Sequence, residues 1–279
     1  MRELLPNTET ETQPEAAIAN WCNKANCRDS DPDMFFPESK DRRYAEEALK
    51  RGLQKAGGTE GSVVVMNPNN GRVLAMANYP TFNPAEYNKV QNAAAFINAA
   101  TMTPQEPGSI MKSFTMAMGI DKGVITPNTT YQNTDCTQVG DRKICNAVRG
   151  LTGTTTMQQA LNNSHNVGTV TVGRKLGDGS YINNAARQTI YQYFHDKYGF
   201  GEKTGIELAE AQGLITSPTE QEGNEVRYAN MTFGQGINLT PIQVTSAFCS
   251  IINGGVYYRP TVVAGVKKGD AVEWSKPQP

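Results

Sequence analysis

The chain has 279 residues, with 26 basic and 27 acidic side chains, and 38% of its residues are hydrophobic. This length suits one large domain, or one domain with a short extension, and the chain has no basic run of the kind that binds nucleic acid or an anionic membrane. No apolar stretch approaches the roughly 18 residues of a membrane span, and residues 1–6 do not resemble a signal peptide.

The first predicted elements are a polar segment and a hairpin. Residues 1–40 are rich in Asn, Thr, Glu, Asp and Pro, so we expect a linker or loop there. Residues 63–66 are apolar and mostly β-branched, residues 68–71 are a strong turn signal, and residues 72–77 return as a second strand. With helices after this hairpin and strand-like residues at 256–266, the pattern indicates an α+β fold rather than regular βαβ alternation.

The most informative segment is residues 106–114, Glu-Pro-Gly-Ser-Ile-Met-Lys-Ser-Phe. The apolar run that follows predicts a buried helix from Ser109 to about Gly123. Ser109 and Lys112 then lie on one helical face, one turn apart. Burial or a nearby cation can lower the pKa of a lysine until it acts as the base that activates a serine.

Other features of this segment suit a catalytic site. Gly108 would let a substrate approach closely, and the backbone N–H groups where the helix begins suit an oxyanion. The alternative is that Ser-x-x-Lys occurs here by chance on a solvated helix surface.

A second polar motif follows about 50 residues later. Residues 155–161 and 167–176 each predict a short helix, and Ser164, His165 and Asn166 lie in the connection between them. The Ser164 hydroxyl could relay a proton to a leaving amine, and the Asn166 carboxamide could hold a substrate amide while bonding the lysine. In isolation a helix cap is the simpler explanation. A triad based on His165 is a further alternative, but no positioned carboxylate accompanies it.

The cysteines leave two pairings open. Cys22 and Cys27, and likewise Cys136 and Cys145, could each close a small disulfide loop, whereas Cys249 lies in an apolar run and is expected to be buried. The alternative is that all five are reduced. Their spacing, with only two histidines in the chain, predicts no zinc site.

Ser-x-x-Lys followed by Ser-x-Asn gives two of the three signatures of penicillin-binding proteins and class A β-lactamases. The chain resembles the transpeptidase domain of class B penicillin-binding proteins, the DD-transpeptidases that cross-link peptidoglycan. The resemblance runs from about Gly61 to about Gly265, and residues 61–80, 198–208 and 233–243 carry it together with the two motifs.

The resemblance implies a fold like that of penicillin-binding proteins and serine β-lactamases, an antiparallel sheet with flanking helices. Residues 1–45 would be a linker or the remnant of an N-terminal region, and residues 46–279 a partial transpeptidase domain.

The resemblance also implies roles for individual residues. Ser109 would be the acylated nucleophile, Lys112 its base, and Ser164 and Asn166 the second catalytic motif, with Gly108 and Asn166 binding substrate. It implies no metal and no cofactor.

The implied partners are the peptidoglycan stem peptide ending in D-Ala-D-Ala, β-lactams as inhibitors, and a membrane glycosyltransferase, but no nucleic acid. The implied location is the extracytoplasmic face of the bacterial inner or plasma membrane.

The third family motif is Lys-Thr/Ser-Gly on a strand beside the cleft. Lys203-Thr204-Gly205 has this composition but lies upstream of Gly234, within a different family segment. We therefore expect it on a loop leading into a strand at residues 206–208, away from Ser109.

We expect the true third motif and the C-terminal strands of the sheet beyond Pro279, and the membrane anchor before Met1. The opening hairpin would then lack partners along one edge. Two other functions stay open. One is a catalytically incomplete pseudo-transpeptidase or wall-synthesis scaffold, and the other is a β-lactam-sensing or β-lactamase relative.

Overall fold

The computed structural model describes residues 2–6, 39–268 and 271–279, so the possible Cys22–Cys27 pair lies outside the described residues. The chain divides into two compact units. Unit 1 comprises Met1–Pro104, Lys203–Ala211 and Thr240–Pro279, and unit 2 comprises Gln105–Glu202 and Gln212–Leu239.

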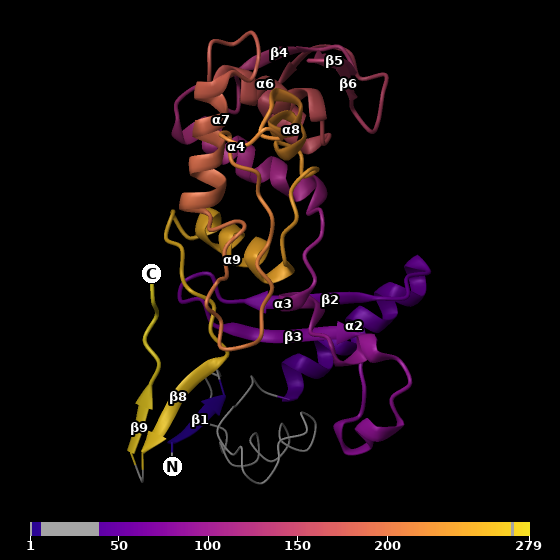
Figure 1. The fold of residues 1–279 in the computed structure, drawn as a ribbon, viewed down its shortest axis with the longest axis vertical. Helices are drawn as coiled ribbons and strands as arrows, with labels where there is room; N and C mark the ends of the chain where they lie inside the picture. The colour runs from indigo at the N-terminus through magenta and orange to yellow at the C-terminus, as the bar shows by residue number, and fades with distance from the viewer. Residues whose placement is uncertain (1, 7–38, 269–270) are drawn as a thin grey trace. The chain divides into compact units, whose positions relative to one another are not determined.

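Unit 1 contains the predicted hairpin. Strands β2 (Gly61–Met66) and β3 (Val73–Tyr79) pair antiparallel, and the side chains of Asn67 and Asn70 accept backbone N–H bonds within the turn. Val73, Ala75 and Ala77 of β3 are buried in alternation. Helix α2 (Ser39–Ala56) packs on this strand and buries Ala45 against it (Figure 1).

Unit 1 also contains a second small sheet and further helices. Strand β8 pairs with β1 on one side and with β9 on the other, antiparallel in both cases. The bounds are β1 (Arg2–Pro6), β8 (Val263–Lys268), β9 (Ala271–Trp274), α3 (Ala99–Met102), α9 (Pro241–Ile252), and the 3-10 turns η1 (Pro84–Lys89) and η2 (Ala93–Phe96).

Two predicted strands differ from the structure. The strand expected over residues 256–266 begins only at Val263. Before it, Thr261 makes a single parallel bridge to Arg72, and the N–H of Val262 bonds to the Glu207 side chain instead of a neighbouring strand. No strand forms at residues 206–208, where Glu207 is engaged by this neighbouring segment. The linker expected over residues 1–45 stays a prediction, although its described parts are β1 and the start of α2.

Unit 2 is mainly helical, with two small antiparallel ladders, β4 with β7 and β5 with β6. Its elements are η3 (Gly108–Ile110), α4 (Met111–Asp121), β4 (Thr130–Asn133), β5 (Cys136–Val139), β6 (Arg142–Cys145), β7 (Gly153–Thr156), α5 (Met157–Asn162), α6 (Asn166–Lys175), α7 (Asn184–Tyr191), the π-helical η4 (Gln192–Lys197) and α8 (Glu225–Met231). The α+β class predicted from the sequence is confirmed.

The predicted helices of unit 2 are confirmed with shifted ends. The helix expected from Ser109 opens as the 3-10 turn η3 and becomes α-helical only at Met111, and it ends at Asp121, just before Gly123. Helix α5 begins two residues later than expected, because Thr156 caps it and accepts the backbone N–H of Gln159.

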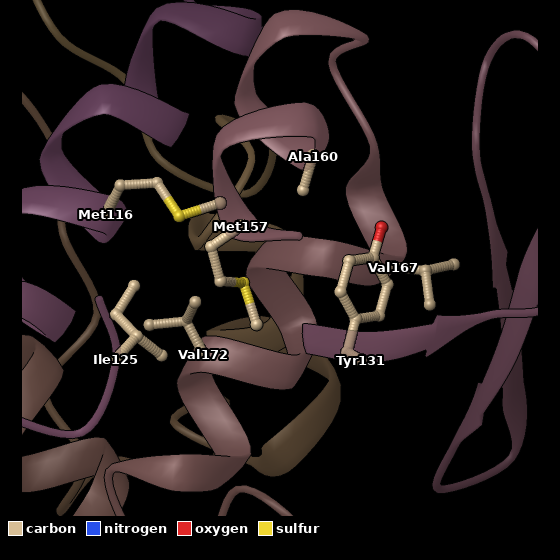
Figure 2. Packing of buried hydrophobic residues seen from close by; sticks show 7 residues of the cluster. All are labelled: Met116, Ile125, Tyr131, Met157, Ala160, Val167 and Val172. Atoms are coloured by element: carbon tan, nitrogen blue, oxygen red, sulfur yellow. The ribbon is translucent and has the colours of Figure 1, made fainter. Parts of the chain in front are cut away.

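A buried cluster fixes α4, α5 and α6 to one another. Figure 2 shows the two thioethers of Met116 and Met157 beside Val172, and the Tyr131 ring beside Val167. Glycines allow the close approach: a Cβ on Gly168 would lie 2.6 Å from the Ala160 Cβ, and one on Gly119 would lie 2.7 Å from Val172. This packing sets the distance between the helix that carries Lys112 and the turn that carries Ser164.

Candidate active site

Ser109 lies exposed on η3, in a turn held by neighbouring backbone. Gly108 has a φ of 66° and donates its N–H to the Gly234 carbonyl at 3.0 Å. The Gly234 backbone lies so close that a Cβ there would be 1.9 Å from the Gly108 oxygen. Glu106 adds a second tie, since its carboxylate accepts the N–H of Gly236 at 2.7 Å. The segment around Gly234 therefore fixes the position of Ser109.

Lys112 is buried on α4, with 2% of its surface exposed. Its Nζ donates to the Ser109 Oγ at 3.2 Å, and to both the Oγ and the backbone oxygen of Ser164 at 2.7 Å. Burial lowers the pKa of Lys112 to about 8. The amine can therefore lose its proton near neutral pH while it contacts both serine hydroxyls.

Ser164 turns its hydroxyl and its carbonyl toward the same lysine because its backbone is left-handed, with a φ of 54°. Its N–H bonds to the Leu161 oxygen, which ends α5, and the N–H of His165 bonds to the Ala160 oxygen. The Ser164 Oγ also donates to the Ser109 Oγ at 3.1 Å. Lys112, Ser109 and Ser164 thus form a closed hydrogen-bonded triangle.

Asn166 is the first residue of α6, and its side chain makes a different contact from the one expected. Its Nδ2 donates to the Cys145 carbonyl at 2.8 Å, and within the described part of the chain it makes no bond to Lys112. The expected Asn166–Lys112 bond is therefore absent from this structure, where the Lys112 Nζ donates to oxygens of Ser109 and Ser164 instead. The Asn166 Oδ1 can still accept a bond from a substrate N–H.

His165 points into the core beneath this triangle. It is 1% exposed, and its Nδ1 lies 2.8 Å from the Tyr131 hydroxyl. Burial lowers the pKa of His165 most, nearby Lys112 lowers it further, and Asp135 raises it. Its ring bonds to neither serine in the described residues, so the alternative of a His165 triad is not supported.

Two further predictions concern residues outside the triangle. Cys136 and Cys145 form a disulfide that closes the β5–β6 hairpin, and Cys249 is free and buried. Thr204 and Gly205 belong to unit 1, where their N–H groups bond to the Glu210 carboxylate. The expected separation of Lys203 from Ser109 stays a prediction.

The sequence did not indicate three contacts that shape the site: Asn166 with the Cys145 carbonyl, Glu106 with Gly236, and Tyr131 with His165. Backbone carbonyls and N–H groups leave no signal in a sequence. The glycines at 234 and 236 were a signal, since paired glycines indicate a close backbone approach.

The comparisons with known proteins agree with this geometry. Residues 61–279 match the family model of the penicillin-binding protein transpeptidase domain. Stage V sporulation protein D of Bacillus subtilis is 32% identical over 77% of this chain and 30% of its own length. Penicillin-binding protein PbpB of Mycobacterium tuberculosis is 27% identical over 85% of this chain and 33% of its own length.

Solved structures give the same result. Penicillin-binding protein 3 of Mycobacterium tuberculosis, complexed with ampicillin, has a TM-score of 0.77 and 26% identity over 86% of this chain and 51% of that one. The same protein has also been solved with aztreonam. The chain spans about a third of the length of these curated relatives and about half of these solved chains.

Proposed function

The chain belongs to the penicillin-binding protein transpeptidase family, and on that premise we propose that it carries out the acyl-transfer chemistry of a peptidoglycan DD-transpeptidase through an ester at Ser109. The observation that carries this proposal is the triangle in which one buried amine, Lys112, contacts the hydroxyls of Ser109 and Ser164. Names of relatives support the substrate class: FtsI of Escherichia coli, 28% identical over 74% of this chain, is a peptidoglycan D,D-transpeptidase.

The first half-reaction makes the ester. Neutral Lys112 accepts the proton of the Ser109 hydroxyl, and the Ser109 oxygen attacks the carbonyl of the D-Ala-D-Ala peptide bond. Ser164, which is hydrogen-bonded to both Lys112 and Ser109, then passes a proton to the leaving amine of D-alanine. Asn166 and the backbone beside Gly108 hold the substrate amide.

The second half-reaction breaks the ester. An amine of a neighbouring stem peptide attacks the Ser109 ester carbonyl, an amide forms, and the amine proton returns to the Ser109 oxygen. The cyclic amide of a β-lactam resembles the amide of the donor and would acylate the same serine. β-Lactams would therefore inhibit this chain.

The disulfide indicates the compartment in which the domain resides. A Cys136–Cys145 bond persists in oxidising surroundings, so we place the domain on the extracytoplasmic face of the bacterial membrane. None of the helices in the described residues could span a membrane. A membrane glycosyltransferase would be the partner that supplies glycan strands. One similar structure is a putative peptidoglycan glycosyltransferase from Atopobium parvulum, with a TM-score of 0.72 and 28% identity.

A fluorescent penicillin tests the proposal. In a chain that includes the third family motif, we expect stoichiometric labelling that maps to Ser109, that Ser109→Ala abolishes, and that Lys112→Ala slows strongly because the serine then has no base. Ser113→Ala is the matched control, since Ser113 lies on the same helix outside the triangle. Labelling at another residue, or labelling unaffected by Ser109→Ala, would contradict the proposal.

The same assay separates the alternatives. Reversible binding without a covalent adduct would favour a pseudo-transpeptidase or scaffold. An adduct that forms and is then rapidly hydrolysed would favour a β-lactamase relative.

A further inference from the structure

A polar groove lies beside the catalytic triangle, entirely within unit 2. It has a volume of about 1240 Å³. One wall is the disulfide-closed β5–β6 hairpin, residues 140–145, and the other is the segment of residues 222–236, which includes α8. Asn166 and Glu106 also line it.

The groove is continuous with residues that hold the site. Asn166 is two residues from Ser164 and is bonded to the hairpin wall through the Cys145 carbonyl. Glu106 lies three residues before Ser109 and is bonded to Gly236, also in the lining. A ligand in the groove therefore touches the same segments that place Ser109 and Ser164. Small-molecule pockets measure about 300–1000 Å³, so this groove has room for a peptide.

Most charged side chains that line the groove already have a hydrogen-bond or ion-pair partner. The Glu106 and Glu225 carboxylates accept backbone N–H groups of Gly236 and Ile182, and Arg227 donates to the Gly236 carbonyl. At the exposed edge of the hairpin, Arg142 lies 3.6 Å from Asp141.

Two charges of opposite sign are left for a ligand. Lys143 on β6 and Glu222 on the opposite wall are both exposed, and in the part of the chain that the structure describes neither side chain has a hydrogen-bond or ion-pair partner. Uncharged donors and acceptors line the same wall as Glu222, on Asn224, Asn230 and Gln235. The lining suits a peptide backbone that carries one carboxylate and one amine.

We propose that this groove binds the acceptor peptide, the molecule whose amine attacks the Ser109 ester. This inference rests on the proposed function and names the subsite for its second substrate. The carboxylate of the acceptor pairs with Lys143, and Glu222 attracts its ammonium group during approach. The acceptor must carry an amine, because an amine attacks the ester. Glu222 can pair with that group while it is an ammonium, whereas a donor that carried only a carboxylate would leave Glu222 without a counter-charge.

Transfer of the acyl group from Ser109 to the acceptor amine needs no other reagent. The acceptor amine, once deprotonated, forms a bond to the acyl carbon, and the bond from that carbon to the Ser109 oxygen breaks. The amine proton passes through Lys112 or Ser164 to the Ser109 oxygen, so an amide and a free serine hydroxyl are restored.

Binding can be measured apart from catalysis in a Ser109→Ala background. We would titrate that protein, by NMR, with a tetrapeptide that has a free lysine amine and a free C-terminal carboxylate, and with the same peptide amidated at its C-terminus. Lys143→Glu should weaken binding of the carboxylate peptide about fivefold to tenfold and barely change binding of the amidated one. Glu222→Lys should weaken both, because both carry the amine.

Lys122→Glu is the matched control, with the same charge change on an exposed lysine of unit 2 outside the groove, and it should bind both peptides as the parent does. The proposal is overturned if Lys143→Glu and Lys122→Glu bind the carboxylate peptide equally well, or if chemical shifts change elsewhere than along the groove.

Penicillin labelling with Ser109 intact separates the two proposals. Lys143→Glu and Glu222→Lys should label as fast as the parent chain. With a thioester donor they should give less amide product and more hydrolysis at equal acceptor concentration. Failure of a chain that includes the third family motif to label would count against the proposed function, whereas the peptide titration judges the groove independently. Slow labelling of either groove variant would show that these residues act on the serine itself, which contradicts a separate acceptor site.

Discussion

Lys112 is surrounded by three oxygen atoms of two serines, and its charge state decides what it can do. As an ammonium it donates hydrogen bonds to all three. As a neutral amine it keeps a lone pair, which can accept the Ser109 proton. Because burial brings the pKa of Lys112 to about 8, the second form is well populated just above neutral pH.

The rate of Ser109 acylation should therefore depend on pH. We expect the rate to rise through pH 7 to 9 with a midpoint near the Lys112 pKa of about 8, because only the neutral amine acts as base. Stopped-flow measurement with a chromogenic cephalosporin gives the profile, and Ser109→Ala corrects for spontaneous hydrolysis. A flat profile over this range would show that Lys112 is not the base.

Gly234 offers a second test at the scale of one residue. Gly234 and Gly179 have similar φ values, 92° and 87°, but a Cβ on Gly234 meets the Gly108 carbonyl, whereas one on Gly179 meets nothing within 4 Å. We expect Gly179→Ala to cost about 1 kcal/mol of unfolding free energy from backbone strain alone. Gly234→Ala should cost about 2–4 kcal/mol, because the turn that carries Ser109 must also move.

Urea unfolding measures both variants, and penicillin labelling reports whether Ser109 has shifted. Equal costs for the two alanines would mean that the contact between Gly234 and Gly108 does not hold the turn.

At the scale of elements, the β5–β6 hairpin connects two features of the site. Its disulfide joins Cys136 to Cys145, and the carbonyl of Cys145 holds the Asn166 side chain. The hairpin is small, and in the described residues no third strand pairs with it, so the disulfide is its main covalent restraint.

Replacing both cysteines with serine should lower the unfolding free energy by about 2–3 kcal/mol, the loop-closure value for a separation of nine residues. A thiol reductant added to the parent chain should produce the same loss and should leave the double variant unchanged. If the parent and the variant unfold alike without reductant, the hairpin is held by its ladder and packing instead.

The sequence predicted those elements whose cause is local. Alternating apolar residues and a Pro-Asn-Asn-Gly turn predict β2 and β3, and the Ser-x-x-Lys spacing places Ser109 and Lys112 within reach on one helix. No strand forms at residues 206–208, where the Glu207 carboxylate bonds to the backbone of Val262, 55 residues away. The Asn166 contact was missed, since its partner is a backbone carbonyl 21 residues away. Sequence periodicity carries no information about either partner.

At the scale of the whole molecule, the residues of the triangle all belong to unit 2. The stability of that unit therefore sets whether the site exists. His165 is buried at its centre, bonded to Tyr131, with Lys112 and Asp135 as the charges that act on it.

Because the pKa of His165 is lowered in the folded chain, the unfolded chain binds a proton more readily below its ordinary pKa of about 6.5. The stabilisation by neutral His165 is thus fully present above that pH and is lost progressively as the pH falls below it. We expect the unfolding free energy of the parent chain to decline from pH 7.5 to 5. The unfolding free energy of His165→Gln should decline less steeply over the same range. Parallel declines for both proteins in guanidinium unfolding would exclude His165 as the cause.

The two histidines of the chain differ in burial, and one of them can therefore report on the reaction in an NMR spectrum. His165 is sealed in the core next to Lys112, whereas His195 lies on η4, stacked on Tyr191 and partly open to solvent. Their imidazole carbon-bound protons resonate in an uncrowded part of the NMR spectrum. When a ligand esterifies Ser109, the charge and contacts of Lys112 change, and the His165 signal must respond while the His195 signal serves as reference. Acylation can thus be followed in real time in the unlabelled chain, with ligands that carry neither a dye nor a chromophore.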